Sequence, residues 1–183
     1  MSPRLLFLLG ASLASISVLR SEIKLTAPEP VLLTSAGQSA DVQILKTLFD
    51  RSKVSARTLP LAKPEDLAGA KTLVVAVGGS AKGLGAAGID ADKETARLKA
   101  VLAKAKEMKL PVVAMHVGGE SKRGDLSDGL YKLVVGAAAQ VVVVKDGDKD
   151  GFLTKAAEAA GVPVEKVEKL VGVIDPIKKI FGK

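Results

Sequence analysis

The chain has 183 residues, of which 48% are apolar and only 3% aromatic, so its length and composition suit one α/β unit with an aliphatic core. The formal net charge is +7, but the lysines are spread among glutamates and there is no tryptophan, so we expect no nucleic-acid partner. The absence of cysteine excludes disulfides, thiol nucleophiles and thiolate metal sites, and the single histidine argues against zinc.

Residues 1–21 have the build of an export signal. Arg4 supplies positive charge ahead of the uncharged apolar run Leu5–Leu19, which is too short for a comfortable membrane span. No Ala-x-Ala cleavage site follows, so an uncleaved membrane anchor is the alternative. We expect an exported protein, periplasmic or extracellular, that meets a membrane only through this segment. Residues 22–30 then form a connector, and residues 31–183 a single α/β domain.

Strand and helix patterns alternate along the rest of the chain. Strands are expected at Val31–Thr34, Val54–Thr58, Thr72–Val77, Pro111–Met115 and Val141–Val144. Amphipathic helical patterns separate them, and from Val164 onwards the apolar spacing predicts a helical tail that packs against the sheet. Five strands joined by right-handed crossovers predict a doubly wound, flavodoxin-like or Rossmann-like parallel sheet in the order 2-1-3-4-5, with helices on both faces.

The sequence resembles a known family in three segments, namely 31–41 (Val-Leu-Leu-Thr-Ser-Ala-Gly-Gln-Ser-Ala-Asp), 78–90 (Gly-Gly-Ser-Ala-Lys-Gly-Leu-Gly-Ala-Ala-Gly-Ile-Asp) and 149–151 (Lys-Asp-Gly). From about residue 30 to its end, the chain is similar to a family of exported bacterial α/β proteins known only as a domain of unknown function. The resemblance implies export and an α/β fold. It implies no activity, cofactor or catalytic residue.

Polar and glycine-rich residues follow the first, third and fourth predicted strands. Ligands of open parallel sheets bind beyond the carboxyl ends of the strands, where the strand order reverses. Glycines there allow backbone N–H groups to approach a ligand, and Lys82 adds a positive charge. We therefore predict a site for a small anionic ligand, with no cofactor indicated. Its residues are Ser35, Gly37, Gln38, Ser39, Gly78, Gly79, Ser80, Lys82, His116, Gly118 and Gly119.

Two other functions stay open, although we favour binding over catalysis. In a small hydrolase or transferase, Ser80 is the nucleophile and His116 its general base, oriented by Asp146 or Asp150. Against this hypothesis, Lys82 stands where the motif G-x-S-x-G requires its second glycine. In a protein-interaction or assembly module, such as a homo-oligomer, the crevice is incidental.

Two familiar motifs are incomplete. Gly83–Gly88 spells G-x-G-x-x-G, but the segment Gly78–Lys82 separates it from the preceding strand, and no acidic residue ends the next strand. The acidic loop that begins at Asp146 has Ala157 where a calcium-binding EF-hand loop needs glutamate. We therefore expect neither a dinucleotide nor a dedicated metal site.

Overall fold

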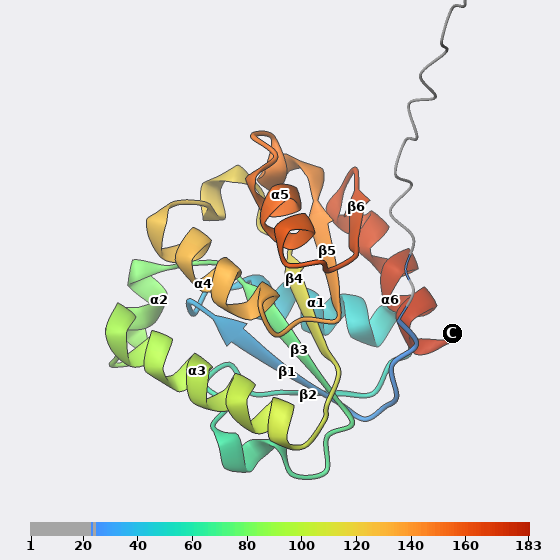
Figure 1. Ribbon diagram of the computed structural model, residues 1–183, viewed down its shortest axis with the longest axis horizontal. Coiled ribbons are helices and arrows are strands. Elements are labelled where there is room, and N and C mark those ends of the chain that lie inside the picture. The colour runs from blue at the N-terminus through green and yellow to red at the C-terminus, as the bar shows by residue number, and fades with distance from the viewer. Residues whose placement is uncertain (1–22, 24) are drawn as a thin grey trace, which may run out of the picture.

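The computed structural model describes Ile23 and residues 25–183, and the predicted leader lies outside these residues (Figure 1). One parallel sheet of six strands, in the order β2-β1-β3-β4-β5-β6, forms the centre of the molecule. The strands are β1 (Val31–Ala36), β2 (Ala56–Thr58), β3 (Thr72–Val77), β4 (Val112–His116), β5 (Gln140–Val144) and β6 (Val164–Val167). The expected doubly wound α/β architecture is confirmed, with one strand more than predicted.

Helices cover both faces of the sheet. They are α1 (Asp41–Arg51), α2 (Ala81–Ala86), α3 (Ala91–Glu107), α4 (Asp125–Val135), α5 (Phe152–Ala159) and α6 (Ile174–Phe181). Short 3₁₀ turns are η1 (Pro64–Leu67), η2 (Glu120–Lys122), η3 (Lys145–Asp148) and η4 (Leu170–Val173). Helices α3, α4 and α5 pack on one face, and α1 and α6 pack on the other (Figure 1). In the described part of the chain, no helix has the length and apolar character needed to cross a membrane.

The prediction of a helix starting at Val164 was wrong, because β6 forms there. Val164 pairs with Val141 and Val167 with Val144, which makes β6 the edge strand beside β5. Two valines three residues apart fit one turn of a helix as well as a short strand. Pairing with β5 decides the conformation, and that partner is not visible in the local pattern.

The end of the chain packs against the sheet, as the sequence predicted. Ile177 and Ile180 of α6 are fully buried, and the ring of Phe181 meets that of Phe49 edge-on at 5.6 Å. The connector before β1 runs beside α6, where the amide of Ala27 donates to the carbonyl oxygen of Ile180 at 2.8 Å. The α1–α6 face of the sheet is therefore closed by the two ends of the described chain.

Candidate functional site

The loops after β1 and β3 meet at the carboxyl edge of the sheet. The amide of Ser80 donates to the carbonyl of Gly37 at 2.8 Å, and Gln38 pairs with Gly79 in an isolated β-bridge. A Cβ on Gly37 would lie 2.6 Å from the carbonyl oxygen of Gly78, so a side chain there would prevent this approach. The two loops therefore pack directly on each other, and no open slot separates them.

The backbone amides expected to hold an anion are already bonded within the protein. The amide of Gly78 donates to the carbonyl of Ala36 at 3.0 Å, and that of Gly79 donates to the hydroxyl of Ser127 at 2.7 Å. The third amide, of Ser80, is bonded to the β1 loop as described above. An anion could use these donors only by replacing bonds that join the loops.

The glycine-rich segment after β3 is helical over Ala81–Ala86. Ser80 caps α2, because its hydroxyl accepts a hydrogen bond from the amide of Gly83 at 3.0 Å. Lys82 lies exposed on this helix. A Cβ on Gly83 would lie 1.9 Å from the carbonyl oxygen of Gln38, so this glycine lets α2 pack against the β1 loop. Part of the glycine content thus serves packing.

A buried ion pair that sequence reasoning missed holds the β1 loop in place. Glu94 of α3 is fully buried and accepts hydrogen bonds from the amide of Gly37 at 2.8 Å and the side-chain amide of Gln38 at 3.0 Å. Arg97 donates to both carboxylate oxygens of Glu94 at 2.8 Å and to the carbonyl of Ser35 at 2.6 Å. Burial by itself would raise the pKa of Glu94, but the bonds from Arg97 and Gly37 outweigh it and keep that pKa below its ordinary value.

The signal for this pair was present in the helical spacing. Glu94 lies four residues before Leu98 and seven before Val101, which places it on the apolar side of α3. A carboxylate on a buried helical face needs a cationic partner, and Arg97 stands three residues away.

One buried carboxylate oxygen at this edge has no hydrogen-bond partner among the described residues. Asp41, the first residue of α1, is only 2% exposed, and its Oδ2 makes no hydrogen bond there. A Cβ on Gly78 would lie 2.7 Å from this oxygen, and one on Gly118 would lie 2.3 Å from it. Oδ2 therefore lies between the loops after β3 and β4, beside the point where the strand order reverses. Buried polar groups are almost always bonded, so this oxygen is the most telling feature of the site.

Of the remaining predicted residues at this edge of the sheet, Ser39 and Gly118 lie next to Asp41. Ser39 is buried, and its hydroxyl accepts a hydrogen bond from the amide of Asp41 at 3.3 Å. The hydroxyl of Ser35 is buried in β1 without a partner among the described residues. A Cβ on Gly118 would also lie 2.3 Å from Cγ of Lys122, so this lysine extends along the same backbone. Gly119 adopts a positive φ of 69°, which favours glycine.

His116 lies beneath the loops at the end of β4. It is 1% exposed, with Nδ1 2.9 Å from the carbonyl oxygen of Val77 and Nε2 3.3 Å from that of Gly119. Burial lowers the pKa of His116, and the two carbonyl contacts oppose this shift only in part. The β5 loop covers the ring, because a Cβ on Gly147 would lie 2.5 Å from Nε2.

The pair proposed for catalysis is not joined in this structure. Among the described residues no hydrogen bond links Ser80 to His116, since the serine caps α2 and the histidine contacts two carbonyl groups. A hydrolase mechanism through this pair would require His116 to exchange a carbonyl contact for the hydroxyl of Ser80, and that function stays a prediction.

A small polar cavity of about 300 Å³ lies between the loops after β4 and β5. Its charged lining residues are Glu120, Arg123, Asp128, Asp146, Lys149 and Asp150. They pair with one another, as Arg123 does with Asp128 at 2.6 Å and Lys149 with Glu120 at 2.8 Å. The described residues contain no group of three or more histidine, aspartate or glutamate side chains able to hold a metal ion. The ion pairs across the cavity therefore join the loops after β4 and β5, and its lining lies outside the set of predicted ligand-binding residues.

Comparison with known proteins identifies a family. A family model described as "Domain of unknown function (DUF6305)" matches residues 28–181. No curated protein matches the sequence. Two mutants of the esterase AlinE4, and AlinE4 itself, an SGNH-hydrolase family esterase, resemble the structure at 11–12% identity and a TM-score of 0.32. These matches cover 84–88% of this chain and 81–86% of the esterase chains. Similarity at this level gives no ground for transferring an activity.

Proposed function

The chain belongs to the family described as Domain of unknown function (DUF6305), and we propose its function from its own residues. We propose that it is an exported protein that binds a small molecule at the carboxyl edge of its sheet. The observation that carries the proposal is Oδ2 of Asp41, which is buried and has no partner among the described residues. Burial of a carboxylate oxygen without a hydrogen bond is costly, and a ligand that supplies the missing donor offsets that cost.

The position of Asp41 constrains the ligand. A hydroxyl, amide or ammonium group satisfies a carboxylate oxygen, whereas an anionic group next to Asp41 is repelled. Lys122 extends along Gly118 beside Asp41, and Lys82 is exposed on α2. Both are positive groups for an anionic end that lies farther out. We therefore propose a ligand with a donor at its inner end and a carboxylate or phosphate at its outer end.

Side chains hold the anionic end in this proposal. The amides of Gly78 to Ser80 stay in the bonds that join the loops, so they contribute rigidity to the site instead of binding the ligand directly. The network of Glu94 and Arg97 adds to that rigidity, because it fixes the conformation of the β1 loop.

Isothermal titration with L-serine, D-glycerate and glycerol 3-phosphate tests the proposal, with propionate as the anion that lacks an inner donor. The Asp41→Asn variant keeps the shape of the side chain but replaces one acceptor oxygen by a donor, so we expect a loss of affinity of at least about tenfold. Lys82→Ala should weaken binding by a smaller factor. Asp50→Asn is the matched control, because Asp50 lies exposed at the other end of α1. Equal binding by the Asp41 variant and the natural protein would reject the site.

Export is part of the proposal and rests on residues 1–21. The intact mass of the protein recovered from its source cells checks it. A mass lower by the leader supports cleavage, and a full-length mass in the membrane fraction supports the anchor. Full-length protein in the cytoplasmic fraction would contradict export.

A further inference from the structure

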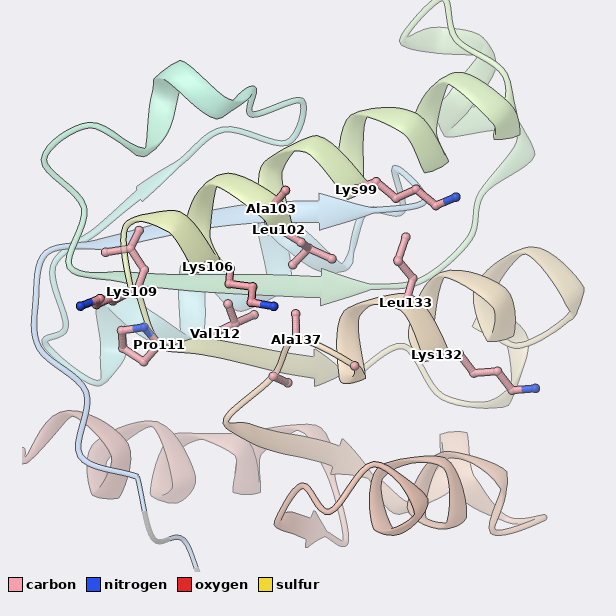
Figure 2. A pocket seen from close by; sticks show the side chains of 13 residues that line it. Lys99, Leu102, Ala103, Lys106, Lys109, Pro111, Val112, Lys132, Leu133 and Ala137 are labelled. Carbon is pink, nitrogen blue, oxygen red and sulfur yellow. The ribbon is translucent and has the colours of Figure 1, made fainter.

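A second hollow, far from Asp41, lies between α3 and α4 at the amino end of β4. Its volume is about 830 Å³. Figure 2 shows Leu102 of α3, Val112 of β4 and Ala137 after α4 directed into the space between these elements. Leu110 and Leu133 complete an apolar floor. The proposed ligand site uses none of these residues.

The walls of this groove carry charge of one sign. Four lysines line it, and no acidic residue does: they are Lys99, Lys106, Lys109 and Lys132. Within the described part of the chain, none of the four makes an ion pair, although Lys93 and Lys104 of the same helix α3 both do. Lys132 lies 5.2 Å from the ring centre of Phe152. The four lysines thus line the groove without acidic partners among the described residues, and Figure 2 shows the ammonium groups of Lys99, Lys109 and Lys132 pointing outward at its rim.

We propose that the groove binds an anionic amphiphile with one compact head group, in the chemical class of a medium-chain fatty-acid carboxylate. The apolar floor removes the tail from water, and the lysine stems can lie along the tail while their ammonium groups reach the head group. A lysine ammonium is a compact charge on a flexible stem, which suits a small carboxylate.

The size of the groove favours a small ligand over a protein partner. Its volume falls in the range of small-molecule sites, roughly 300–1,000 Å³. Lys99 and Lys109 lie ten residues apart along α3 and just beyond its end, a span of roughly 15 Å. A stable protein interface needs about 800 Å² on each partner, more than the exposed apolar surface of this groove offers.

Titration of the full chain with decanoate tests the proposal. Decanol is the matched probe without charge, and acetate is the matched probe without a tail. We expect decanoate to bind at least about tenfold more tightly than either, because the groove supplies both a floor and a positive wall. Comparable binding of decanol would overturn the role of the lysines.

Two kinds of variant locate the site. The double variant Lys99→Glu with Lys106→Glu reverses two charges in the groove and should lower decanoate affinity at least about tenfold. Its control is Lys178→Glu with Lys179→Glu, which makes the same charge change on α6, on the other face of the sheet. The control should leave decanoate affinity unchanged. Should the first pair fail to fold by circular dichroism, Lys99→Gln with Lys106→Gln replaces it. Ala103→Phe, at an exposed position of α3 that also lines the groove, should block the tail without a change in charge.

Further outcomes decide the matter. Unchanged decanoate affinity in both the lysine pair and the Ala103 variant would overturn the proposal. So would a result in which an acidic amphipathic peptide binds with the same lysine dependence and decanoate does not, since the groove would then be a protein-docking surface. Asp41→Asn should leave decanoate binding intact, which separates this site from the one at the carboxyl edge.

Discussion

Gly83 and Gly85 occupy the same short helix α2 but have opposite surroundings. A Cβ on Gly83 would lie 1.9 Å from the carbonyl oxygen of Gln38, whereas a Cβ on Gly85 would meet no atom within 4 Å. We expect Gly83→Ala to cost about 1–3 kcal/mol, because α2 must move away from the β1 loop. Gly85→Ala should instead stabilise by about 0.5–1 kcal/mol through helix propensity. Urea unfolding measures both, and a shift of the same sign in both variants would contradict the packing described for Gly83.

At the residue scale, the sequence predicted positions better than contacts. Gly78, Ser80 and His116 lie at the carboxyl ends of their strands, as expected, because strand ends can be read from apolar runs followed by glycine. Their bonding partners could not be read in this way. The hydroxyl of Ser127, for example, accepts a hydrogen bond from the amide of Gly79, which lies 48 residues away in the sequence. Asp41 escaped notice as a site residue because only the packing of three loops reveals that its oxygen is buried.

Helix α3 is tied to the β1 loop by the Glu94–Arg97 pair. Removal of one partner leaves the other charge buried, so Glu94→Ala should cost about 3–5 kcal/mol. Replacement of both by methionine should cost less than the single change, because no charge then remains unpaired. Unfolding free energies of Glu94→Met, Arg97→Met and the double methionine variant test this. Additive costs would show that the pair does not act as a unit.

At the element scale, a continuous apolar run was predicted well, and two shorter or glycine-rich segments were not. The third strand was predicted with its observed bounds, Thr72–Val77, because it is apolar on both faces. Segment 164–167 was misread, since four residues are too few to separate the helical period from the strand period. The helix Ala81–Ala86 was missed because glycine disfavours helices, and only the cap by Ser80 and its packing explain it.

The stability of the whole molecule should depend on pH through His116. Its pKa in the fold lies below the ordinary value of 6.5, so the unfolded chain takes up the proton first as pH falls. Stability is then complete above about pH 6.5 and declines as pH drops below that value. As the pH is lowered from about 7 to about 5, the thermal unfolding midpoint of the natural protein should fall. The midpoint of His116→Gln should change less over the same range.

Buried carboxylates affect the pH dependence of stability at lower pH than His116 does. Hydrogen bonds from protein groups outweigh burial and lower the pKa of Glu94 and of Asp148, so their contributions are lost only as pH falls below their ordinary values of 4.5 and 3.8. An identical decline in the His116→Gln variant above pH 5 would therefore assign the effect to another group.

At the scale of the whole molecule, the strand order was predicted as the simplest doubly wound arrangement of five strands. Right-handed crossovers and a reversal after the second strand predict the order 2-1-3-4-5, and the added β6 extends it at one edge. The position of the cavities could not be predicted in the same way. The polar cavity beside β5 and the lysine-lined groove both depend on how side chains from different elements fill the space between them.

The hydrogen bond between Ala27 and Ile180 brings the two ends of the described chain side by side. Lys183 adds an ion pair with Glu29 at 2.6 Å, so start and finish of the fold are neighbours. A short peptide linker should join them without disturbing any strand, and the chain could then be opened elsewhere, for instance at the exposed turn around Gly69. Such a circular permutant would keep every strand pairing of the sheet, although the export segment would no longer precede β1.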